Sequence, residues 1–260
     1  MPLPVLPDVP AALRFLSRLP VRLPSEPATD GPPDLDRLGP ALPLAGALLG
    51  LIGALVLVIA HRLGLGDFLA ATLAVATLVA ISGALHEDGM SDVADALGGA
   101  DVARRLEIMK DSRVGAFGVC ALILAFALRI GALAGLLAFG PLAAAAGLMA
   151  AAGASRLAGL WMLAALPFAR ADGLARSAGV PGGASRCGAL GIGFVIAALL
   201  VIPTVGLPAL VGGVLAGIAA FRLVVRLARA QFGGQTGDVA GAATLLVEIA
   251  FLIGLLIFAR

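Results

Sequence analysis

The sequence predicts an all-α integral membrane protein, a polytopic helical bundle with about seven transmembrane helices. Of its 260 residues, 60% are apolar and only 13% are charged, and the mean hydropathy is +1.06. A soluble domain is nearer ~45–50% apolar and ~25% charged. The apolar residues also gather in runs long enough to cross a hydrocarbon core of ~30 Å. A soluble protein of this composition would expose more apolar surface than water tolerates.

The apolar runs divide the chain 1–260 into an N-terminal segment and seven spans within a single membrane-embedded domain. Segment 1–40 contains the amphipathic stretch AALRFLSRLPV and a connector rich in Pro, Asp and Gly, so we expect it to lie outside the bilayer. The expected spans are Ala41–Ala60, Phe68–Leu85, Gly115–Phe139, Pro141–Leu166, Gly188–Ile202, Leu207–Leu227 and Ala240–Phe258. The sequence shows no convincing internal repeat. The fourth span carries Arg156 near its middle and could be two shorter pieces.

Basic residues are distributed unequally between the two sides that these spans define. Segment 1–40 and loops 86–113, 167–187 and 228–239, with the adjoining helix end, hold most of the 18 Lys and Arg residues. Because basic loops stay on the inner side of a membrane, we expect this side to be cytoplasmic and the protein to lie in the cell inner membrane. The net charge of +2 gives no case for nucleic-acid binding.

Acidic residues cluster directly after the second span, in the stretch HEDGMSDVADALGG (86–99). At about 100° per residue, Asp88, Asp92 and Asp95 share one narrow face of a helix. Clustered carboxylates repel one another unless a cation lies between them, and Mg²⁺ prefers such hard oxygen ligands. A solvated helix end is the alternative. The scarcity of charge in the chain and the position beside a membrane span favour the metal site.

The stretch RRLEIMKDSRVGAFG (104–118) lies on the same side as the acidic cluster. It contains Lys110, the only lysine in the chain, and Arg113, with Asp111 between them. Two such cations can bind phosphate while the carboxylate completes a metal site. The same residues also fit the basic flank of a membrane span.

The stretch QFGGQTGDVAGA (231–242) follows the sixth span and precedes the seventh. Gly234 and Gly237 let backbone N–H groups approach a ligand closely, and Thr236 and Asp238 add polar side chains. A glycine-rich loop before a helix can bind an anion, although it is also an ordinary turn. Together, the three stretches predict a cytoplasm-facing, metal-dependent site that handles phosphate at the membrane surface.

In this order, the three stretches resemble the cobalamin synthase family of membrane enzymes, the adenosylcobinamide-GDP ribazoletransferases. FLSRLPV near the start, ASRLAGLWM at 154–162 and ARADGLARS at 169–177 match the family in the same order, so the resemblance covers nearly the whole chain. Two positions depart from it. The family usually has a bulky apolar residue in place of Glu87 and often a glycine in place of Ala96.

The resemblance implies a reaction and its participants. The alcohol of α-ribazole, or of its 5′-phosphate, attacks adenosylcobinamide-GDP at the phosphorus nearest the cobinamide, and GMP leaves as adenosylcobalamin or its 5′-phosphate forms. Mg²⁺ is the implied cofactor. We expect the metal ligands to be Asp88, Asp92 and Asp95, and the catalytic residues to be Asp111, Lys110, Arg113 and Asp238. Substrate contacts are expected from Thr236, Gly234, Gly237, Arg156 and His86.

A few polar residues fall inside the expected spans, where an unpaired charge is costly. Arg156 could face the site or form a structural ion pair, and Glu248 is expected to pair internally. We interpret Arg129 as structural or as snorkelling towards the interface. His86 could support the metal face or simply lie at the interface.

Two other functions compete with this interpretation. A CDP-alcohol phosphotransferase also uses aspartates at a membrane helix end, but Asp92 and Val93 stand where its pattern has Ala and Arg. A transporter would have discontinuous helices and repeated halves. Expected partners are the two substrates and the lipid bilayer, with other cobalamin-pathway enzymes and a second copy of the chain as further candidates.

Overall fold

The computed structural model describes residues 5–21, 34–170, 176 and 178–259, and almost all of them form helices. Short 3-10 turns cover Leu6–Asp8 and Gly39–Ala41. The helices are α1 (Val9–Leu16), α2 (Leu35–Leu38), α3 (Leu42–Arg62), α4 (Asp67–Ser82), α5 (Leu85–Ala96), α6 (Val102–Ile108), α7 (Ala116–Leu137), α8 (Pro141–Ala165), α10 (Gly183–Val205), α11 (Leu207–Phe232) and α12 (Gly237–Phe258).

The described helices confirm an all-α polytopic architecture. Six of them are long and apolar enough to cross a membrane, and the number becomes seven if α4 and α5 form one bent span. Helix α10 begins at Gly183 rather than at the predicted Gly188, and α11 ends at Phe232 rather than at Leu227. These helices continue past the apolar run, because a helix needs apolar side chains only where lipid surrounds it.

The predicted second span, Phe68–Leu85, is wrong as a continuous helix. Helix α4 ends at Ser82, and α5 leaves it at 90°. Between them, Gly83 (φ +66°) and Ala84 (φ +58°) both lie in the left-handed region, which terminates a right-handed helix. Hydropathy did not reveal this break, because it lies within the last residues of the apolar run, which continues through Gly83 and Ala84 to Leu85.

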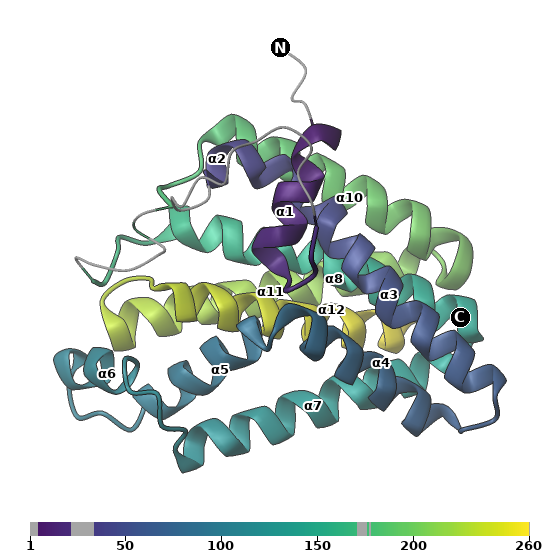
Figure 1. Cartoon of the computed structure of the whole chain (residues 1–260), viewed down its shortest axis with the longest axis horizontal. Coiled ribbons are helices and arrows are strands. Elements are labelled where there is room, and N and C mark those ends of the chain that lie inside the picture. The colour runs from purple at the N-terminus through teal and green to yellow at the C-terminus, as the bar shows by residue number, and fades with distance from the viewer. Residues whose placement is uncertain (1–4, 22–33, 171–175, 177, 260) are drawn as a thin grey trace.

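Small residues bring the long helices into close contact. A β-carbon at Gly46 of α3 would overlap the carbonyl of Ala152 in α8, and one at Gly254 of α12 would overlap the carbonyl of Gly212 in α11. Lipid tails are as apolar as leucine, so helices in a membrane associate through such close packing. Helix α12 lies in the middle of the bundle, between α7 and α10 in Figure 1, and packs against α5, α7, α8 and α11.

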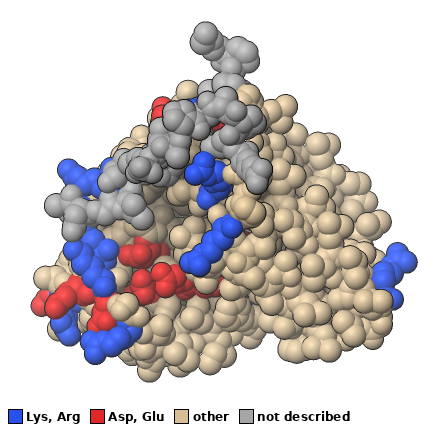
Figure 2. Space-filling view, in the orientation of Figure 1, with Lys and Arg blue, Asp and Glu red and all other residues tan. Residues whose placement is uncertain are grey.

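The outer surface is largely apolar. Large side chains such as Leu199 and Phe68 are 72% and 66% exposed, as expected for a surface that lipid covers. Charged groups concentrate at the end that holds α6 and the last turns of α5, called here the charged end (Figure 2). On the side of the molecule shown in Figure 2, all the visible acidic groups in the lower half lie toward the charged end, whereas basic groups also lie near the middle and at the opposite edge.

Candidate active site

A cluster of aspartates lies where α5 crosses the first turn of α12. Gly89 permits the crossing, since a β-carbon there would lie 2.7 Å from the backbone oxygen of Asp238. Asp88 is exposed and Asp92 half-buried, and Asp92 lies within electrostatic reach of Asp88, Asp238 and Asp95. The fold therefore places Asp238 beside the two α5 aspartates. We use "acidic face" below for Asp88, Asp92 and Asp238.

Asp95 has a structural role besides the metal ligation predicted for it, which stays a prediction. Its two carboxylate oxygens accept hydrogen bonds from the backbone N–H groups of Gly115 and Gly118, at 2.7 and 2.8 Å. These groups lie at the start of α7, where backbone donors have no partner within the helix. A carboxylate there also suits the helix dipole. Asp95 thus ties α5 to the start of α7 while remaining within electrostatic reach of Asp92.

Arg170 provides a cation next to the acidic face. Its Nη1 lies 3.4 Å from Oδ2 of Asp238, and its Nη2 donates to the carbonyl of Leu106 at 3.3 Å. Both charged side chains are largely buried, at 17% and 27% exposure. The negative charges of Asp88 and Asp238 act on Asp92, and Arg170 offsets part of this effect, an arrangement that favours the binding of a further cation.

The glycine-rich loop owes its sequence mainly to local geometry. Gly233 (φ +70°) ends α11, and a β-carbon at Gly234 would collide with the carbonyl of Pro167. The Oγ1 atom of Thr236 accepts a hydrogen bond from the backbone of Val239 at 3.2 Å, which caps α12. Gly237 has open space around it. The predicted substrate contacts of Gly234, Thr236 and Gly237 stay predictions, and the first two residues have structural roles already.

The loop after α6 is held beside this glycine-rich loop. The hydroxyl of Thr236 donates to Sδ of Met109 at 3.4 Å, so the exposed Lys110 follows directly from a residue that contacts the start of α12. Asp111 forms a two-pronged ion pair with Arg113, with its shortest distance 2.6 Å. These hydrogen bonds from Arg113 hold the pKa of the Asp111 carboxyl at about 2, below its ordinary value of 3.8.

The acidic face fits Mg²⁺ by its donor chemistry. Across the described residues, no three His, Cys, Asp or Glu side chains are arranged as a ready metal cage. Mg²⁺ does not require such a cage, because it commonly binds through one or two carboxylates together with waters and substrate phosphates. Asp88, Asp92 and Asp238 offer only oxygen ligands, and they lie near the exposed Lys110 loop.

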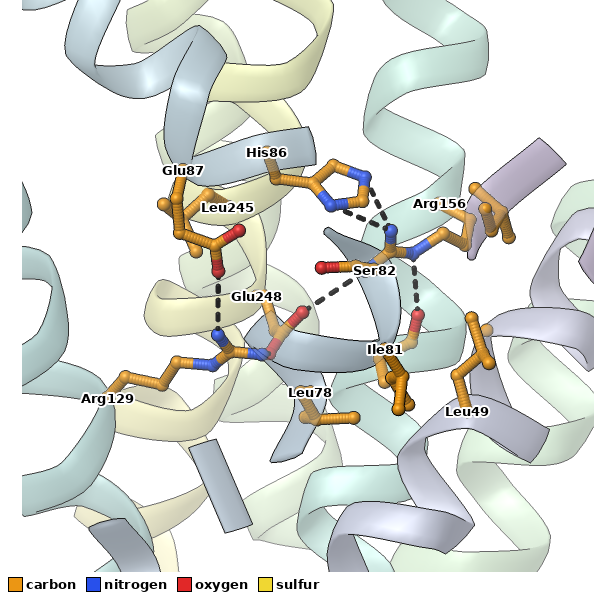
Figure 3. A pocket seen from close by; sticks show the side chains of 13 residues that line it. Leu49, Leu78, Ile81, Ser82, His86, Glu87, Arg129, Arg156, Leu245 and Glu248 are labelled. Atoms are coloured by element: carbon orange, nitrogen blue, oxygen red, sulfur yellow. Dashed lines mark hydrogen bonds and ion pairs between the residues drawn. The ribbon is translucent and has the colours of Figure 1, made fainter. Parts of the chain in front are cut away.

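A second charged cluster lies deeper in the bundle, at the start of α5. It joins Glu87 of α5, Arg129 of α7, Glu248 of α12 and Arg156 of α8, and returns to His86 of α5 (Figure 3). The distances are 3.2 Å for Glu87–Arg129, 2.5 Å for Arg129–Glu248, 3.2 Å for Glu248–Arg156 and 2.6 Å for Arg156–His86. We call these five residues the ion ring.

The ion ring defines the roles of two predicted substrate contacts. The Nε of Arg156 donates to the carbonyl of Ala152 at 3.0 Å, and its two terminal nitrogens contact His86 and Glu248. Arginine has no acceptor, so Nε2 of His86, which faces it, must carry a lone pair rather than a proton. Arg156 and His86 are therefore engaged with protein groups, and their predicted contact with substrate stays a prediction. The internal pairing expected for Glu248 is confirmed.

Sequence reasoning overlooked several residues that the fold makes important. Gly89 looked like an ordinary helix glycine, and Arg170 was counted only among the basic loop residues. Arg129 was interpreted as structural without a partner, whereas it binds both Glu87 and Glu248. An arginine inside an apolar span needs a partner, and its position there was the available signal in the sequence. In the structure the Arg129 side chain is 4% exposed.

Comparison with known proteins gives matches along almost the whole chain. A family model described as cobalamin-5-phosphate synthase matches residues 8–256. The chain is 50% identical over 257 residues to the adenosylcobinamide-GDP ribazoletransferase of Azorhizobium caulinodans, covering 98% of this chain and 97% of that protein. The protein of the same name from Xanthobacter autotrophicus is 49% identical over 256 residues, 96% of each chain. That from Bradyrhizobium diazoefficiens is 46% identical over 250 residues, 96% and 93% of the two chains. No solved structure matches.

Proposed function

The chain belongs to the cobalamin-5-phosphate synthase family, and we propose that it is an adenosylcobinamide-GDP ribazoletransferase. It transfers the adenosylcobinamide-phosphate group to α-ribazole or α-ribazole 5′-phosphate, releases GMP, and forms adenosylcobalamin or its 5′-phosphate late in cobalamin biosynthesis. Similarity over the full length to relatives of that name carries the proposal. The surplus of carboxylates at the charged end supports it.

The reaction exchanges one bond to phosphorus for another. A ribazole hydroxyl oxygen forms a bond to the phosphorus nearest the cobinamide and gives up its proton to water. The bridging P–O bond breaks, and GMP leaves with the bridging oxygen. Asp88, Asp92 and Asp238 would hold Mg²⁺, which when bound neutralises charge on the pyrophosphate and on the departing GMP. Asp95 is left out of this ligand set because its oxygens cap α7.

Basic side chains around the acidic face would bind the remaining phosphate charge. Arg170 lies beside Asp238, and Lys110 lies on the loop that Met109 anchors to Thr236. Arg113 is oriented by Asp111, so this pair would act as one unit that holds the loop. A carboxyl with a pKa of about 2 is a weak base at neutral pH, so the role that we propose for Asp111 is to orient Arg113.

The competing functions have less support. Asp92 and Val93 still depart from the phosphotransferase pattern, and the relatives carry a different name. The break between α4 and α5 is a feature that transporters share. Here, however, the break leads into a ring of paired charges around a cavity of about 30 Å³, which holds about one water. A cavity of this size is far smaller than a substrate, so the ring gives the transporter interpretation no support.

We further propose that the charged end faces the cytoplasm and that the protein is a multi-pass protein of the inner membrane. Both orientation and compartment rest on the distribution of Lys and Arg along the sequence. Nucleotide-linked substrates would then reach the acidic face from the cytoplasm without crossing the bilayer.

Activity of the purified full-length protein in detergent tests this function. Adenosylcobinamide-GDP, α-ribazole 5′-phosphate and Mg²⁺ are supplied, and chromatography follows GMP and the cobalamin product. A parallel reaction receives CDP-diacylglycerol and a small alcohol. We expect equal amounts of GMP and adenosylcobalamin 5′-phosphate, and no release of CMP. Well-folded protein that releases CMP, or that forms no cobalamin product, would contradict the proposal.

A further inference from the structure

Helix α5 does not continue in the direction of α4, the helix before it. Gly83 and Ala84 interrupt the backbone, and the 90° turn separates α5 from α4. The side chain of Arg18 fills the space over Gly83, and its backbone N–H donates to the carbonyl of Ile81 at 2.7 Å, so the break is packed from outside. The orientation of α5, and with it of Asp88 and Asp92, must come from contacts that its own residues make.

The ion ring supplies those contacts at the first turn of α5. His86 and Glu87 immediately precede Asp88, and the ring joins them to α7, α8 and α12 (Figure 3). Helix α12 contributes Glu248 to the ring and Asp238 to the acidic face. One set of buried ion pairs therefore links both helices whose aspartates would share a cation.

The charges of the ring balance. With His86 neutral, two carboxylates face two guanidinium groups, and all four charged side chains are at most 9% exposed. Breaking a buried pair on one side leaves an uncompensated charge, whereas replacing a whole pair with apolar groups is often tolerated. Without Glu87, Glu248 would be the one carboxylate of the ring for both Arg129 and Arg156.

We propose that Glu87 and Arg129 are positioning residues of the proposed transferase. Glu87 neutralises Arg129, so Glu248 keeps its contact with Arg156, and Arg156 keeps its contact with His86. Through these contacts the ring sets α5 against α12 and fixes the spacing of Asp88 and Asp92 from Asp238. The inference rests on the proposed function, although neither Glu87 nor Arg129 need touch a substrate.

A double-mutant cycle in the full-length protein tests this arrangement. Glu87→Leu and Arg129→Met are compared with the double variant, with the conservative variant Arg129→Lys, and with the control Asp67→Asn. Asp67 pairs with His61 at the surface, outside the acidic face and the ion ring. For each variant, the folded fraction, kcat, both KM values and Mn²⁺ binding by electron paramagnetic resonance are measured.

Each single variant should lose on the order of 100-fold in kcat per folded molecule, as expected for a site displaced by about 1 Å. Mn²⁺ binding should weaken about tenfold, while both KM values stay near those of the wild type. The double variant should recover to within about tenfold of wild-type kcat, because the remaining ring is balanced again. Arg129→Lys should retain most activity, and Asp67→Asn all of it.

Several outcomes would overturn the inference. If folded single variants keep wild-type kcat and Mn²⁺ affinity, the ion ring is only a stabilising feature. A double variant no better than either single variant would show that charge balance is not what matters. If the wild type lacks transferase activity, the proposed function fails on its own, and the Mn²⁺ comparison across the cycle still tests the positioning role.

Discussion

The acidic face and the ion ring occupy neighbouring turns of α5 but differ in how their charges are compensated. In the ring, two buried carboxylates meet two buried guanidinium groups. On the acidic face, three more accessible carboxylates have Arg170 as their neighbouring cation. A buried cluster must balance because desolvated charge is costly. An accessible cluster can keep a surplus, and that surplus is what gives the acidic face its capacity to bind a cation.

The largest expected effect follows from removing one carboxylate of the acidic face. Asp88→Asn should lower kcat/KM on the order of 1000-fold, since a bound metal contributes several kcal/mol of charge stabilisation. The melting temperature should stay the same or rise, because repulsion with Asp92 is relieved. Steady-state kinetics and thermal unfolding measure the two quantities. A large loss of stability with activity retained would reverse the comparison.

The opposite pattern is expected in the ion ring. Glu248→Leu leaves Arg129 and Arg156 to share Glu87 and should destabilise the protein by about 3–5 kcal/mol, as for other broken buried ion pairs. Unfolding in detergent by heat and by denaturant measures this change. The matched surface variant Glu107→Gln, which breaks the exposed pair with Arg104, should cost less than about 1 kcal/mol. Similar losses in the two variants would show that the ring is not a special feature.

A smaller effect is expected where an acidic residue of α5 serves as a cap. Asp95→Asn keeps one side-chain oxygen for the start of α7 and should cost about 1 kcal/mol of stability, with catalysis reduced far less than in Asp88→Asn. Thermal unfolding and kinetics on the same samples distinguish the two roles. A loss of activity as large as that of Asp88→Asn would return Asp95 to the metal ligands.

The smallest effect concerns Asp111, whose pKa of about 2 lies below the ordinary value of 3.8. The ionised Asp111 carboxylate is favoured in the folded state, because Arg113 donates hydrogen bonds to it. Its contribution to stability is therefore complete above pH about 4 and is lost as the pH falls towards 2. Between pH 5.5 and 9 the carboxyl stays ionised, so Asp111→Asn should leave the shape of the kcat/KM profile unchanged. If kcat/KM of the wild type falls at low pH and this fall is absent in Asp111→Asn, Asp111 would be identified as a base.

The sequence predicted most of the fold, because lipid imposes a long apolar run on each spanning helix. The α4–α5 break escaped prediction, since Ala84 adopts a left-handed conformation that its residue type does not favour. Helical periodicity correctly placed Asp88 and Asp92 on one face. Spacing within one helix could not show that the Asp95 carboxylate also caps the start of α7.

The remaining parts of the site depend on contacts between helices. Asp238 meets the α5 aspartates only because Gly89 admits the backbone of α12. The contacts of the ion ring join residues that are 42 to 119 positions apart in sequence, from Glu87–Arg129 to Arg129–Glu248. Single-sequence patterns indicated that Arg156 and Glu248 were costly charges in a span, but the identity of each partner required the packed bundle.

The dependence of transfer on Mg²⁺ most directly tests the claim that the acidic face holds the metal. Wild type, Asp92→Asn and Asp67→Asn are stripped with EDTA and titrated with Mg²⁺ while formation of the cobalamin product is measured. The account predicts saturable activation of the wild type and of Asp67→Asn, and a nearly flat response of folded Asp92→Asn. Full activity of the stripped wild type, or an Asp92→Asn titration that matches the wild type, would contradict it.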